Sequence, residues 1–325
     1  MAHHQHPLGS GFTAASTADD VIQGIDLTGK NVIVTGGHSG LGLETTRVLS
    51  RAGAFVTVGA RDPARAARAI AGLARVEISP LDLVAPASVD AFARRWLKNG
   101  RPLHVLVNSA APISSKTVTR DARGYELHFA TSHLGHFQLT IALLPALAAA
   151  AGARVVNVSS GAQRFGEIRW DDPSFREGYS SGAAYAQAKK ANVLFAVELD
   201  RRYAADGIRA YAVHPGVVVG TQLNRSAGPE ALRAMGLVDE AGAPIIDPER
   251  GKKTLAQGAA TIVFAATSPL LADIGGVYLK DNDISPLDDT KRTLTADSIP
   301  AEVTTSSIDP EAARRLWALS ERMLA

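Results

Sequence analysis

The sequence contains no cysteine, and this absence removes several classes of chemistry at once. A chain of 325 residues without thiols has no disulfides, no thiolate zinc site and no cysteine nucleophile. It also lacks any apolar run near the roughly 18 residues needed to cross a bilayer, so no membrane span is expected. An excess of one charge is missing too. The 34 basic and 32 acidic residues give a net charge of +2, which predicts neither a nucleic-acid surface nor a polybasic membrane anchor.

The first 20 residues have no apolar core of the kind that a signal peptide contains. They are polar, rich in Gly, Ser and Thr, and include His3, His4 and His6. We expect residues 1–25 to form a flexible tail, with these histidines as part of it rather than a metal site. The expected location of the protein is cytoplasmic.

The rest of the chain alternates short apolar strands with helical stretches. Strands are expected at Asn31–Thr35, Phe55–Ala60, Val76–Ser79, Val105–Asn108, Arg154–Ser159, Arg209–His214 and Val277–Leu279. Helices are expected at Leu41–Ala52, Pro63–Leu73, Pro86–Lys98, Arg123–Ala149, Ala183–Ala205, Glu249–Thr267 and Pro310–Leu324. Because the strands are apolar on both faces, they predict a doubly wound parallel sheet between two helical layers, a single three-layer α/β/α domain of Rossmann type. This domain should span residues 26–285, and residues 286–325 should form a C-terminal extension that ends in a helix.

A Gly-rich turn joins the first strand to the first helix, in the order Thr35-Gly-Gly-His-Ser-Gly-Leu-Gly42. Gly36 allows the tight turn out of the strand, Gly40 lets the backbone approach a phosphate, and Gly42 lets the helix pack closely. The helix N-terminus then faces the pyrophosphate of a dinucleotide. The spacing differs from the usual Gly-x-Gly-x-x-Gly pattern.

A Tyr-x-x-x-Lys pair lies in the helical stretch that follows the fifth strand. A free tyrosine has a pKa of about 10, too high for efficient proton exchange near neutrality. Lys189 lies one helical turn beyond Tyr185 on the same face, so its ammonium is expected to stabilise the phenolate and lower the pKa of Tyr185. A surface helix pair without function is the alternative for such a spacing taken alone.

These two motifs together resemble the short-chain dehydrogenase/reductase family. The similarity covers roughly residues 25–280 and continues at Asp82, at Asn108-Ser-Ala-Ala, at Asn157-Val-Ser-Ser and at His214-Pro-Gly. The sequence is most similar to the branch of retinol dehydrogenases, WW-domain oxidoreductases and protochlorophyllide reductases. The features that favour this branch are His133-Leu-Gly-His-Phe137, Gln257-Gly-Ala-Ala-Thr261 and the 25-residue separation of Ser160 from Tyr185.

The resemblance implies catalytic roles for four residues. Tyr185 would be the general acid/base, Lys189 would also hold the nicotinamide ribose, and Ser160 would orient the substrate oxygen. Ser159 is the competing assignment for that serine. Many relatives have an asparagine where this chain has Ser132, and that asparagine holds a helix kink and a proton-relay water. A serine has one polar atom in place of two, which predicts a weakened relay.

The resemblance also implies a nicotinamide dinucleotide site. Its expected residues are Gly36, His38, Ser39, Gly40, Leu41, Gly42, Arg61, Asp82, Leu83, Asn108, Ala110, Tyr185, Lys189, Pro215, Gly216, Val218 and Thr221. Arg61, at the end of the second strand, favours NADP(H) over NAD(H), because an arginine there suits a 2′-phosphate. Arg65 adds charge nearby, whereas Asp62 is either a helix cap or a ligand of the ribose hydroxyl. Both arginines could also be simply solvated.

We therefore expect an NADP(H)-dependent oxidoreductase that interconverts an alcohol and a carbonyl on an apolar small molecule. One alternative is a catalytically silent dinucleotide-binding sensor or scaffold. Another is a light-driven reductase like protochlorophyllide reductase, against which the lack of cysteine argues. His128, His133 and His136 have no accompanying carboxylate pair, so we expect structural roles and no metal. The sequence leaves undecided whether the protein forms a homo-oligomer. The apolar side chains after Ser160 and within 222–250 either line a substrate pocket or belong to the local core.

Overall fold

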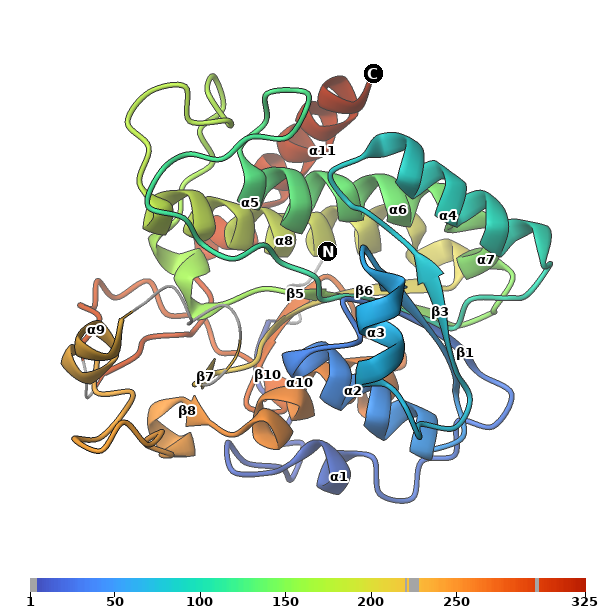
Figure 1. Ribbon diagram of the computed structural model, residues 1–325, viewed down its shortest axis with the longest axis horizontal. Helices are drawn as coiled ribbons and strands as arrows, with labels where there is room; N and C mark the ends of the chain where they lie inside the picture. Colours follow the sequence, from blue (N-terminus) through green and yellow to red (C-terminus); the bar gives the residue numbers. More distant parts are fainter. Residues whose placement is uncertain (1–4, 220, 222–227, 296–297) are drawn as a thin grey trace.

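A computed structural model describes residues 5–219, 221, 228–295 and 298–325, and its centre is a single twisted sheet (Figure 1). Within these residues the sheet has eight strands in the order β10-β9-β6-β5-β4-β1-β2-β3. Their bounds are Asn31–Thr35 (β1), Phe55–Ala60 (β2), Val76–Pro80 (β3), Val105–Asn108 (β4), Ala153–Val158 (β5), Ile208–His214 (β6), Val277–Lys280 (β9) and Asp283–Ile284 (β10). All pairings are parallel except that of β10 with β9. Val217–Val218 (β7) and Lys252–Lys253 (β8) form a small second sheet.

Helices cover both faces of the sheet. One face carries Ala18–Val21 (α1), Gly40–Arg51 (α2), Pro63–Ala69 (α3) and Leu255–Thr267 (α10). The other carries Pro86–Lys98 (α4), Leu127–Phe129 (α5), His136–Ala142 (α6), Leu144–Ala148 (α7), Ser181–Tyr203 (α8) and Pro310–Leu324 (α11), while Pro229–Ala234 (α9) lies apart from the sheet. The predicted doubly wound α/β/α class is confirmed.

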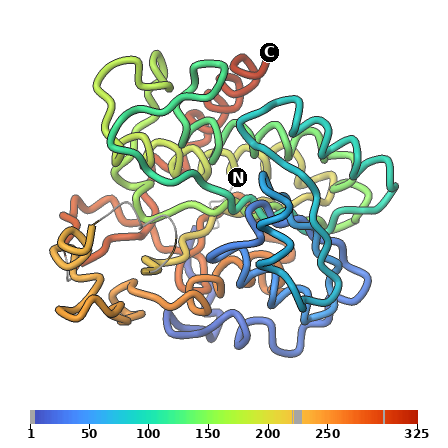
Figure 2. Tube along the Cα trace, viewed as in Figure 1, coloured from blue at the N-terminus to red at the C-terminus, as the bar shows by residue number. Residues whose placement is uncertain are grey.

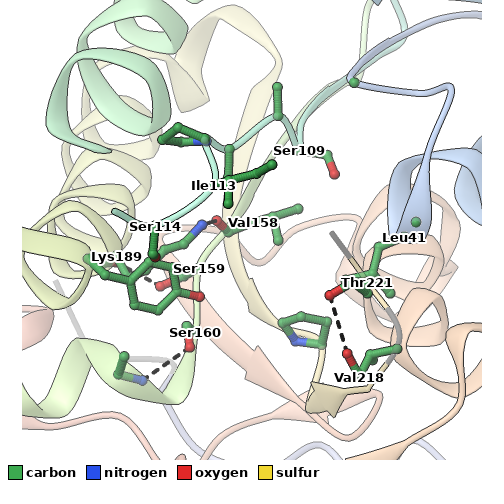
Figure 3. A pocket seen from close by; sticks show the side chains of 18 of the residues that line it. Leu41, Ser109, Ile113, Ser114, Val158, Ser159, Ser160, Lys189, Val218 and Thr221 are labelled. Carbon is green, nitrogen blue, oxygen red and sulfur yellow. Dashed lines mark hydrogen bonds between the residues drawn. The ribbon is translucent and has the colours of Figure 1, made fainter. Parts of the chain in front are cut away.

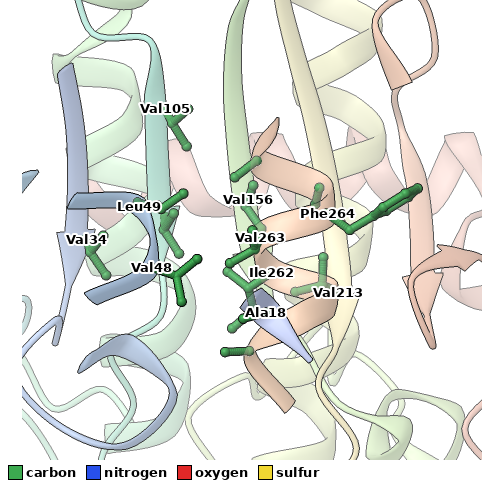
Figure 4. Packing of buried hydrophobic residues seen from close by; sticks show 14 of the residues in the cluster. Ala18, Val34, Val48, Leu49, Val105, Val156, Val213, Ile262, Val263 and Phe264 are labelled. Carbon is green, nitrogen blue, oxygen red and sulfur yellow. The ribbon is translucent and has the colours of Figure 1, made fainter. Parts of the chain in front are cut away.

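The packing of α2 and α10 shows why the apolar strands form the centre. Val48 and Leu49 of α2, with Ile262 and Val263 of α10, lie against Val156 and other strand residues, all fully buried (Figure 4). Burying one such side chain contributes about 1.5–3 kcal/mol. Both faces of the sheet gain this stabilisation, which is why the strands carry no polar alternation.

The predicted helix over Arg123–Ala149 is broken into shorter pieces in the structure. It begins only at Leu127, because the Glu126 side chain accepts hydrogen bonds from the backbone N–H groups of His128 and Phe129 and so caps α5. A π-helical segment at Ala130–Gly135 follows. There the chain passes so close to the β3–α4 connection that a Cβ on Gly135 would lie 2.3 Å from the Leu83 carbonyl oxygen. Wider turns therefore accommodate a close approach that periodicity alone does not reveal.

The N-terminal segment packs on the body from Gln5 onward, where a flexible tail was expected. Gln5 donates hydrogen bonds to the carbonyls of Tyr278 and Ser285 and accepts one from the Tyr278 N–H. Asp283 accepts hydrogen bonds from the backbone of Leu8 and its two successors. The chain then continues over the body to α1, which packs on α10 (Figure 2). Residues 1–4, with His3 and His4, lie outside the described residues.

None of the described helices combines the length and the hydropathy needed to cross a membrane.

Candidate active site

The carboxyl ends of the central strands open into a cavity of about 1080 Å³ (Figure 3). β1 lies between β2 and β4, so the chain winds outward from β1 in opposite directions. In doubly wound sheets this switch point leaves a crevice where ligands bind. All predicted catalytic and cofactor residues line the cavity except Asn108 and Ser132.

The Gly-rich turn is held by close backbone contacts that only glycine permits. Gly36 has φ +66° and Gly40 has φ +52°, and a Cβ on Gly36 would meet the Ala110 Cα at 3.2 Å. A Cβ on Gly42 would lie 2.6 Å from the Gly36 carbonyl oxygen. Ser39 precedes α2 without making a side-chain capping bond. The first N–H groups of α2 can therefore bind an anion at the end of the cavity.

Thr35 fixes the opposite side of this turn, a role that the sequence did not predict. Its Oγ1 accepts hydrogen bonds from the N–H groups of Ser109 at 2.9 Å and Ala110 at 3.0 Å, and contacts His136 Nε2 at 2.8 Å. The Asn108 side chain points into the protein instead and donates to Asn157 Oδ1 at 2.8 Å. Asn108 thus ties β4 to β5, and the cavity wall after β4 consists of Ser109 and Ala110.

Three charged side chains lie where the adenosine end of a dinucleotide is expected. Arg61 and Arg65 are exposed and line the cavity. Asp62 Oδ1 accepts a hydrogen bond from Arg65 N at 3.0 Å, so this carboxylate caps α3. Burial and then the charge of Arg65 lower the pKa of His38, which lines the same region in its neutral form. Two cations therefore face the cavity, while the Asp62 carboxylate is engaged by a helix N-terminus.

Asp82 and Leu83 line the cavity at the end of β3, as predicted. Asp82 Oδ1 accepts a hydrogen bond from Val84 N at 3.2 Å, which holds the carboxylate in place.

The Tyr-x-x-x-Lys pair lies on α8 and faces the cavity. Lys189 Nζ is 5.5 Å from the centre of the Tyr185 ring and donates a 2.9 Å hydrogen bond to the Val158 carbonyl. Burial lowers the pKa of Lys189 to about 8. The expected lowering of the Tyr185 pKa is not found. Burial raises the pKa of Tyr185, and its hydrogen bond with Ser160 offsets this only in part.

The structure distinguishes the two serines that follow β5. Ser159 is buried, and its hydroxyl donates a 2.7 Å hydrogen bond to the Lys189 carbonyl, on the backbone of α8. Ser160 is half-buried, accepts a hydrogen bond from Ala162 N and so caps the next turn (Figure 3). Its interaction with Tyr185 works against the effect of burial on the Tyr185 pKa. Ser160 therefore faces the cavity with Tyr185, whereas Ser159 links β5 to α8.

The chain after β6 forms the roof of the cavity. Gly216 has φ +80°, and Pro215, Gly216, Val218 and Thr221 all line the space. Thr221 Oγ1 donates to the Val218 carbonyl at 3.3 Å, and a Cβ on Gly40 would lie 3.9 Å from the Thr221 methyl group. Thr221 therefore lies across from the Gly-rich turn. Part of the 222–250 segment, residues 222–227, lies outside the described residues.

Known proteins resemble this chain over most of its length. The family model for short chain dehydrogenase matches residues 30–231, well over half of the chain. The chain belongs to this family. It is 44% identical over 299 residues to a probable oxidoreductase of Streptomyces lividans, covering 90% of this chain and 97% of the relative.

The predicted branch of this family is also confirmed. Mouse retinol dehydrogenase 12 is 36% identical over 263 residues, which is 79% of each chain. A WW domain-containing oxidoreductase of Pongo abelii is 35% identical over 329 residues, covering 96% of this chain and 72% of the relative. A solved structure of an uncharacterised Mycobacterium paratuberculosis protein aligns with a TM-score of 0.70 at 31% identity, covering 95% and 97% of the two chains. The protein is therefore an oxidoreductase of the short chain dehydrogenase family.

In this short chain dehydrogenase, Ser132 lies behind the cavity wall, inside the π-helical segment. It is 1% exposed, and its carbonyl accepts a hydrogen bond from His136 Nδ1 at 3.1 Å. Its hydroxyl has no hydrogen-bond partner within the described part of the chain. The helix irregularity expected at this position is thus present, while the side chain that would support it differs from that of many relatives.

The neighbouring histidines have structural partners. His133 Nε2 contacts Ser320 Oγ of α11 at 2.7 Å, and His136 contacts Thr35 as described above. Across the described ranges, no group of three His, Cys, Asp or Glu side chains is arranged to hold a metal.

A segment that the sequence did not connect to the site forms the outer wall of the cavity. We call residues 288–302 the C-terminal strap, and Leu294, Thr295, Ile299 and Pro300 of its described part line the cavity. The buried Arg164 anchors it by donating to the carbonyls of Glu302 at 3.0 Å and Thr290 at 2.8 Å. Because Arg164 lies four residues after Ser160, the anchor ties the strap directly to the loop that carries Ser160.

The aromatic residues of the loop after Ser160 divide between pocket and core. Phe165 lines the cavity and is half exposed, whereas Phe175 is buried and Trp170 packs against the cluster under α11. Met235 and Leu237 also line the cavity.

Proposed function

We propose that this short chain dehydrogenase interconverts an alcohol and a carbonyl with NADP(H), and that NAD(H) is the poorer cofactor. The observation that carries the proposal is the convergence of Ser160, Tyr185 and Lys189 on the cavity that begins at the Gly-rich turn. A catalytically silent dinucleotide sensor is the competing function, and the partnerless hydroxyl of Ser132 is its support.

The residues of the cavity fit a dinucleotide. A Cβ at Gly36 or Gly42 would press on the backbone of the turn, and Gly40 has φ +52°, so the turn keeps its glycines where its backbone would approach a pyrophosphate. Arg61 and Arg65 supply two cations for a 2′-phosphate, and Asp62 is held by the N-terminus of α3. A carboxylate engaged in this way is poorly placed to accept a ribose hydroxyl, which favours the phosphorylated cofactor.

The nicotinamide, when bound, would supply or accept the hydride. In carbonyl reduction the Tyr185 hydroxyl donates its proton to the substrate oxygen, and Ser160 orients that oxygen. The raised pKa of Tyr185 keeps it protonated and ready to donate. Lys189, with a pKa of about 8, is mostly protonated at neutral pH, so its charge stabilises the phenolate that is left behind. Alcohol oxidation uses the same groups in reverse.

The substrate part of the cavity is apolar. Ile113, Phe165, Met235 and Leu294 are each about half exposed and all line the cavity. Large apolar side chains left open to solvent in a concave site are typical of binding surfaces for apolar ligands. We therefore propose a lipophilic alcohol, ketone or aldehyde as the substrate class.

Assays of lipophilic alcohols, ketones and aldehydes with both cofactors test this function. Tyr185→Phe removes the proton and keeps the ring, so turnover should fall by about 10²–10⁴ while cofactor affinity stays near that of the wild type. Lys189→Met should damage both turnover and cofactor binding. Tyr179→Phe is the matched control, because Tyr179 does not line the cavity and its hydroxyl donates to the Ser115 carbonyl. Cofactor binding without turnover of any compound would favour the sensor, and full activity of Tyr185→Phe would refute the mechanism.

A further inference from the structure

The charged side chains that line the cavity lie at the end proposed for the cofactor and at the proposed catalytic residues. Among the described residues they are Arg61, Asp62, Arg65, Asp82 and Lys189. The first four follow β2 and β3, and Lys189 lies beside Tyr185 on α8. The other described residues that line the cavity carry no formal charge at neutral pH. An ionised group in the substrate part of the cavity would lose its water without gaining a partner, so this part favours uncharged molecules.

Ser114 brings a hydroxyl to this apolar part of the cavity. It directly follows Ile113, and both residues line the cavity (Figure 3). Its Oγ lies 3.2 Å from Nε2 of His128. The rings of His128 and Tyr185 meet edge to face, with centres 5.6 Å apart and planes at 80°. One imidazole thus joins the Ser114 hydroxyl to the ring of the proposed acid/base, which places the hydroxyl near the reacting end of a bound substrate.

His128 holds the Ser114 hydroxyl without supplying a charge. The imidazole is 2% exposed, and burial followed by the charge of Lys189 lowers its pKa to about 4, so it is neutral at physiological pH. Its Nδ1 has no hydrogen-bond partner among the residues that the structure describes, so no contact there fixes the tautomer. With the proton on Nε2, the ring donates to Ser114 and leaves the serine proton free for a ligand. With the proton on Nδ1, Ser114 donates to the ring and its lone pairs stay free.

The unused hydrogen-bonding capacity of Ser114 is open to the cavity. A hydroxyl has one donor and two acceptor sites, and His128 occupies one of these three. A substrate that displaces water from this part of the cavity leaves the other sites unpaired, unless it brings a polar atom of its own. A site built to bind a hydroxyl therefore discriminates against an analogue that lacks it. Because the serine and the imidazole are both neutral, the group that matches them is an uncharged oxygen.

We propose that Ser114, held by His128, determines substrate specificity by binding a second oxygen, a hydroxyl or a carbonyl, of an uncharged lipophilic substrate. The proposal rests on the proposed function and narrows its substrate class to hydroxyketones and diketones, with the corresponding diols in the oxidative direction. Ser114 contacts the substrate, and His128 is a positioning residue that acts through Ser114. No bond is formed or broken at either residue, since the reacting carbonyl is the one at Tyr185.

A matched set of ketones tests this specificity. It consists of straight-chain methyl ketones with a hydroxyl one, two or three carbons from the carbonyl, each paired with the analogue that carries a methyl group there. We expect the wild type with NADPH to prefer the hydroxyl at one of these positions by about 3–10-fold in kcat/KM, mainly through KM. Ser114→Ala should abolish this preference, whereas Ser114→Thr, which keeps a hydroxyl, should retain part of it. Ser115→Ala is the control, because Ser115 lies outside the cavity lining and its hydroxyl contacts Thr117.

His128→Phe tests the positioning role, because it keeps a ring beside Tyr185 and removes both nitrogens. It should lose the same preference, and the double variant with Ser114→Ala should lose no more, since the two residues act through one contact. Calorimetry of the same ketones with the wild type and NADP⁺ measures the preference without turnover.

A wild type without preference in both measurements would overturn the proposal, and so would a preference that survives Ser114→Ala. Losses that add in the double variant would overturn the role of His128. Full activity of Tyr185→Phe would instead refute the proposed function, so the two failures are distinguishable.

Discussion

The two sides of the cavity are built in different ways. The side that we propose for the cofactor, the cofactor side, consists of the Gly-rich turn and the ends of β2, β3 and β4. Its shape comes from backbone contacts within a few ångströms of Gly36 and Gly42. The side that we propose for the substrate, the substrate side, consists of Ile113, Phe165, Met235 and the C-terminal strap, which are far apart in the sequence. The shape of the cofactor side is therefore set by contacts between residues close in the sequence. The substrate side depends on ion pairs and hydrogen bonds to carbonyl groups between residues far apart in the sequence.

This difference predicts that the two sides can be damaged separately. Residues that fix the strap should change substrate binding and stability, whereas residues of the turn should change cofactor binding. The predictions below test that separation.

Arg164→Met should have the largest effect, because it removes a buried cation that binds the strap at several points. Its side chain is 3% exposed, and it lies 3.4 Å from the Glu302 carboxylate. Removing one partner of a buried ion pair typically costs about 3–5 kcal/mol. We expect this loss in urea unfolding, together with a higher KM for the substrate and a nearly unchanged Kd for NADPH.

Arg201→Met is the control for this prediction. Arg201 also pairs with a buried carboxylate, that of Glu198, but it is one-third exposed, and Arg202 binds the same carboxylate. Its removal should cost no more than about 1 kcal/mol. An equal loss of NADPH affinity and substrate affinity in Arg164→Met would show that the two sides are not separate.

Gly42→Ala should weaken cofactor binding, with a smaller free-energy cost than that of Arg164→Met. The new Cβ would lie 2.6 Å from a carbonyl oxygen of the turn, and overpacking of this kind costs up to about 3 kcal/mol. We expect NADPH affinity to fall by up to about 100-fold, measured by fluorescence titration. Gly228→Ala is the control, because no atom of the described residues lies within 4 Å of its Cβ position. Unchanged NADPH affinity in Gly42→Ala would mean that the Gly-rich turn does not bind the cofactor.

The sequence predicted the backbone of the Gly-rich turn and its flanking strands well because their signals are local. The strands Asn31–Thr35 and Phe55–Ala60 have the predicted bounds, and the turn glycines have the contacts that their spacing indicated. Apolar runs and glycine positions depend on neighbours in the chain, which the sequence displays directly.

The substrate side could not be predicted in the same way. Nothing near Leu294 or Ile299 marks them as cavity residues, since Arg164 places them from more than 120 positions away. The periodicity did not reveal the helix break at Ala130–Gly135, which only the family resemblance indicated, because the break lies where the chain closely approaches Leu83. Gln5 was assigned to a free tail because its partner strands lie more than 270 residues later. In each case a tertiary contact overrode a correct local pattern.

Arg61→Ala tests which of the two cofactors the cofactor side prefers. Only NADPH would lose a charge-assisted contact, worth about 1.5–3 kcal/mol, so NADPH should weaken about tenfold or more while NADH changes little. Titrating both cofactors against both proteins measures this. An initial preference for NADH, or equal weakening of the two, would contradict the choice of NADP(H) and leave Asp62 as the selector.

His214 joins the two sides, and its pH dependence gives the smallest expected effect. It ends β6 and lines the cavity, and its Nδ1 accepts a 2.9 Å hydrogen bond from the N–H of Gly161, the residue after Ser160. Burial lowers the pKa of His214 to about 3, and the nearby charges of Asp281, Lys253, Lys280 and Glu302 act in both directions. A protonated ring could not accept the Gly161 hydrogen bond, so the folded state requires the neutral form.

The sign of the pH effect follows from the lowered pKa. The unfolded state binds a proton on His214 below about pH 6.5, whereas the folded state does not until about pH 3. Stability from this group is therefore complete above pH 6.5 and is lost at about 1.4 kcal/mol per pH unit as the pH falls toward 3. In His214→Asn the amide oxygen still accepts from Gly161 but does not titrate. Between pH 7 and 5.5, the free energy of unfolding should then fall by about 1 kcal/mol less than in the wild type. The other buried histidines should contribute equally to the pH dependence of both proteins. An identical pH dependence in both proteins would mean that His214 is protonated in the folded state, and that another contact holds Ser160 between the two sides.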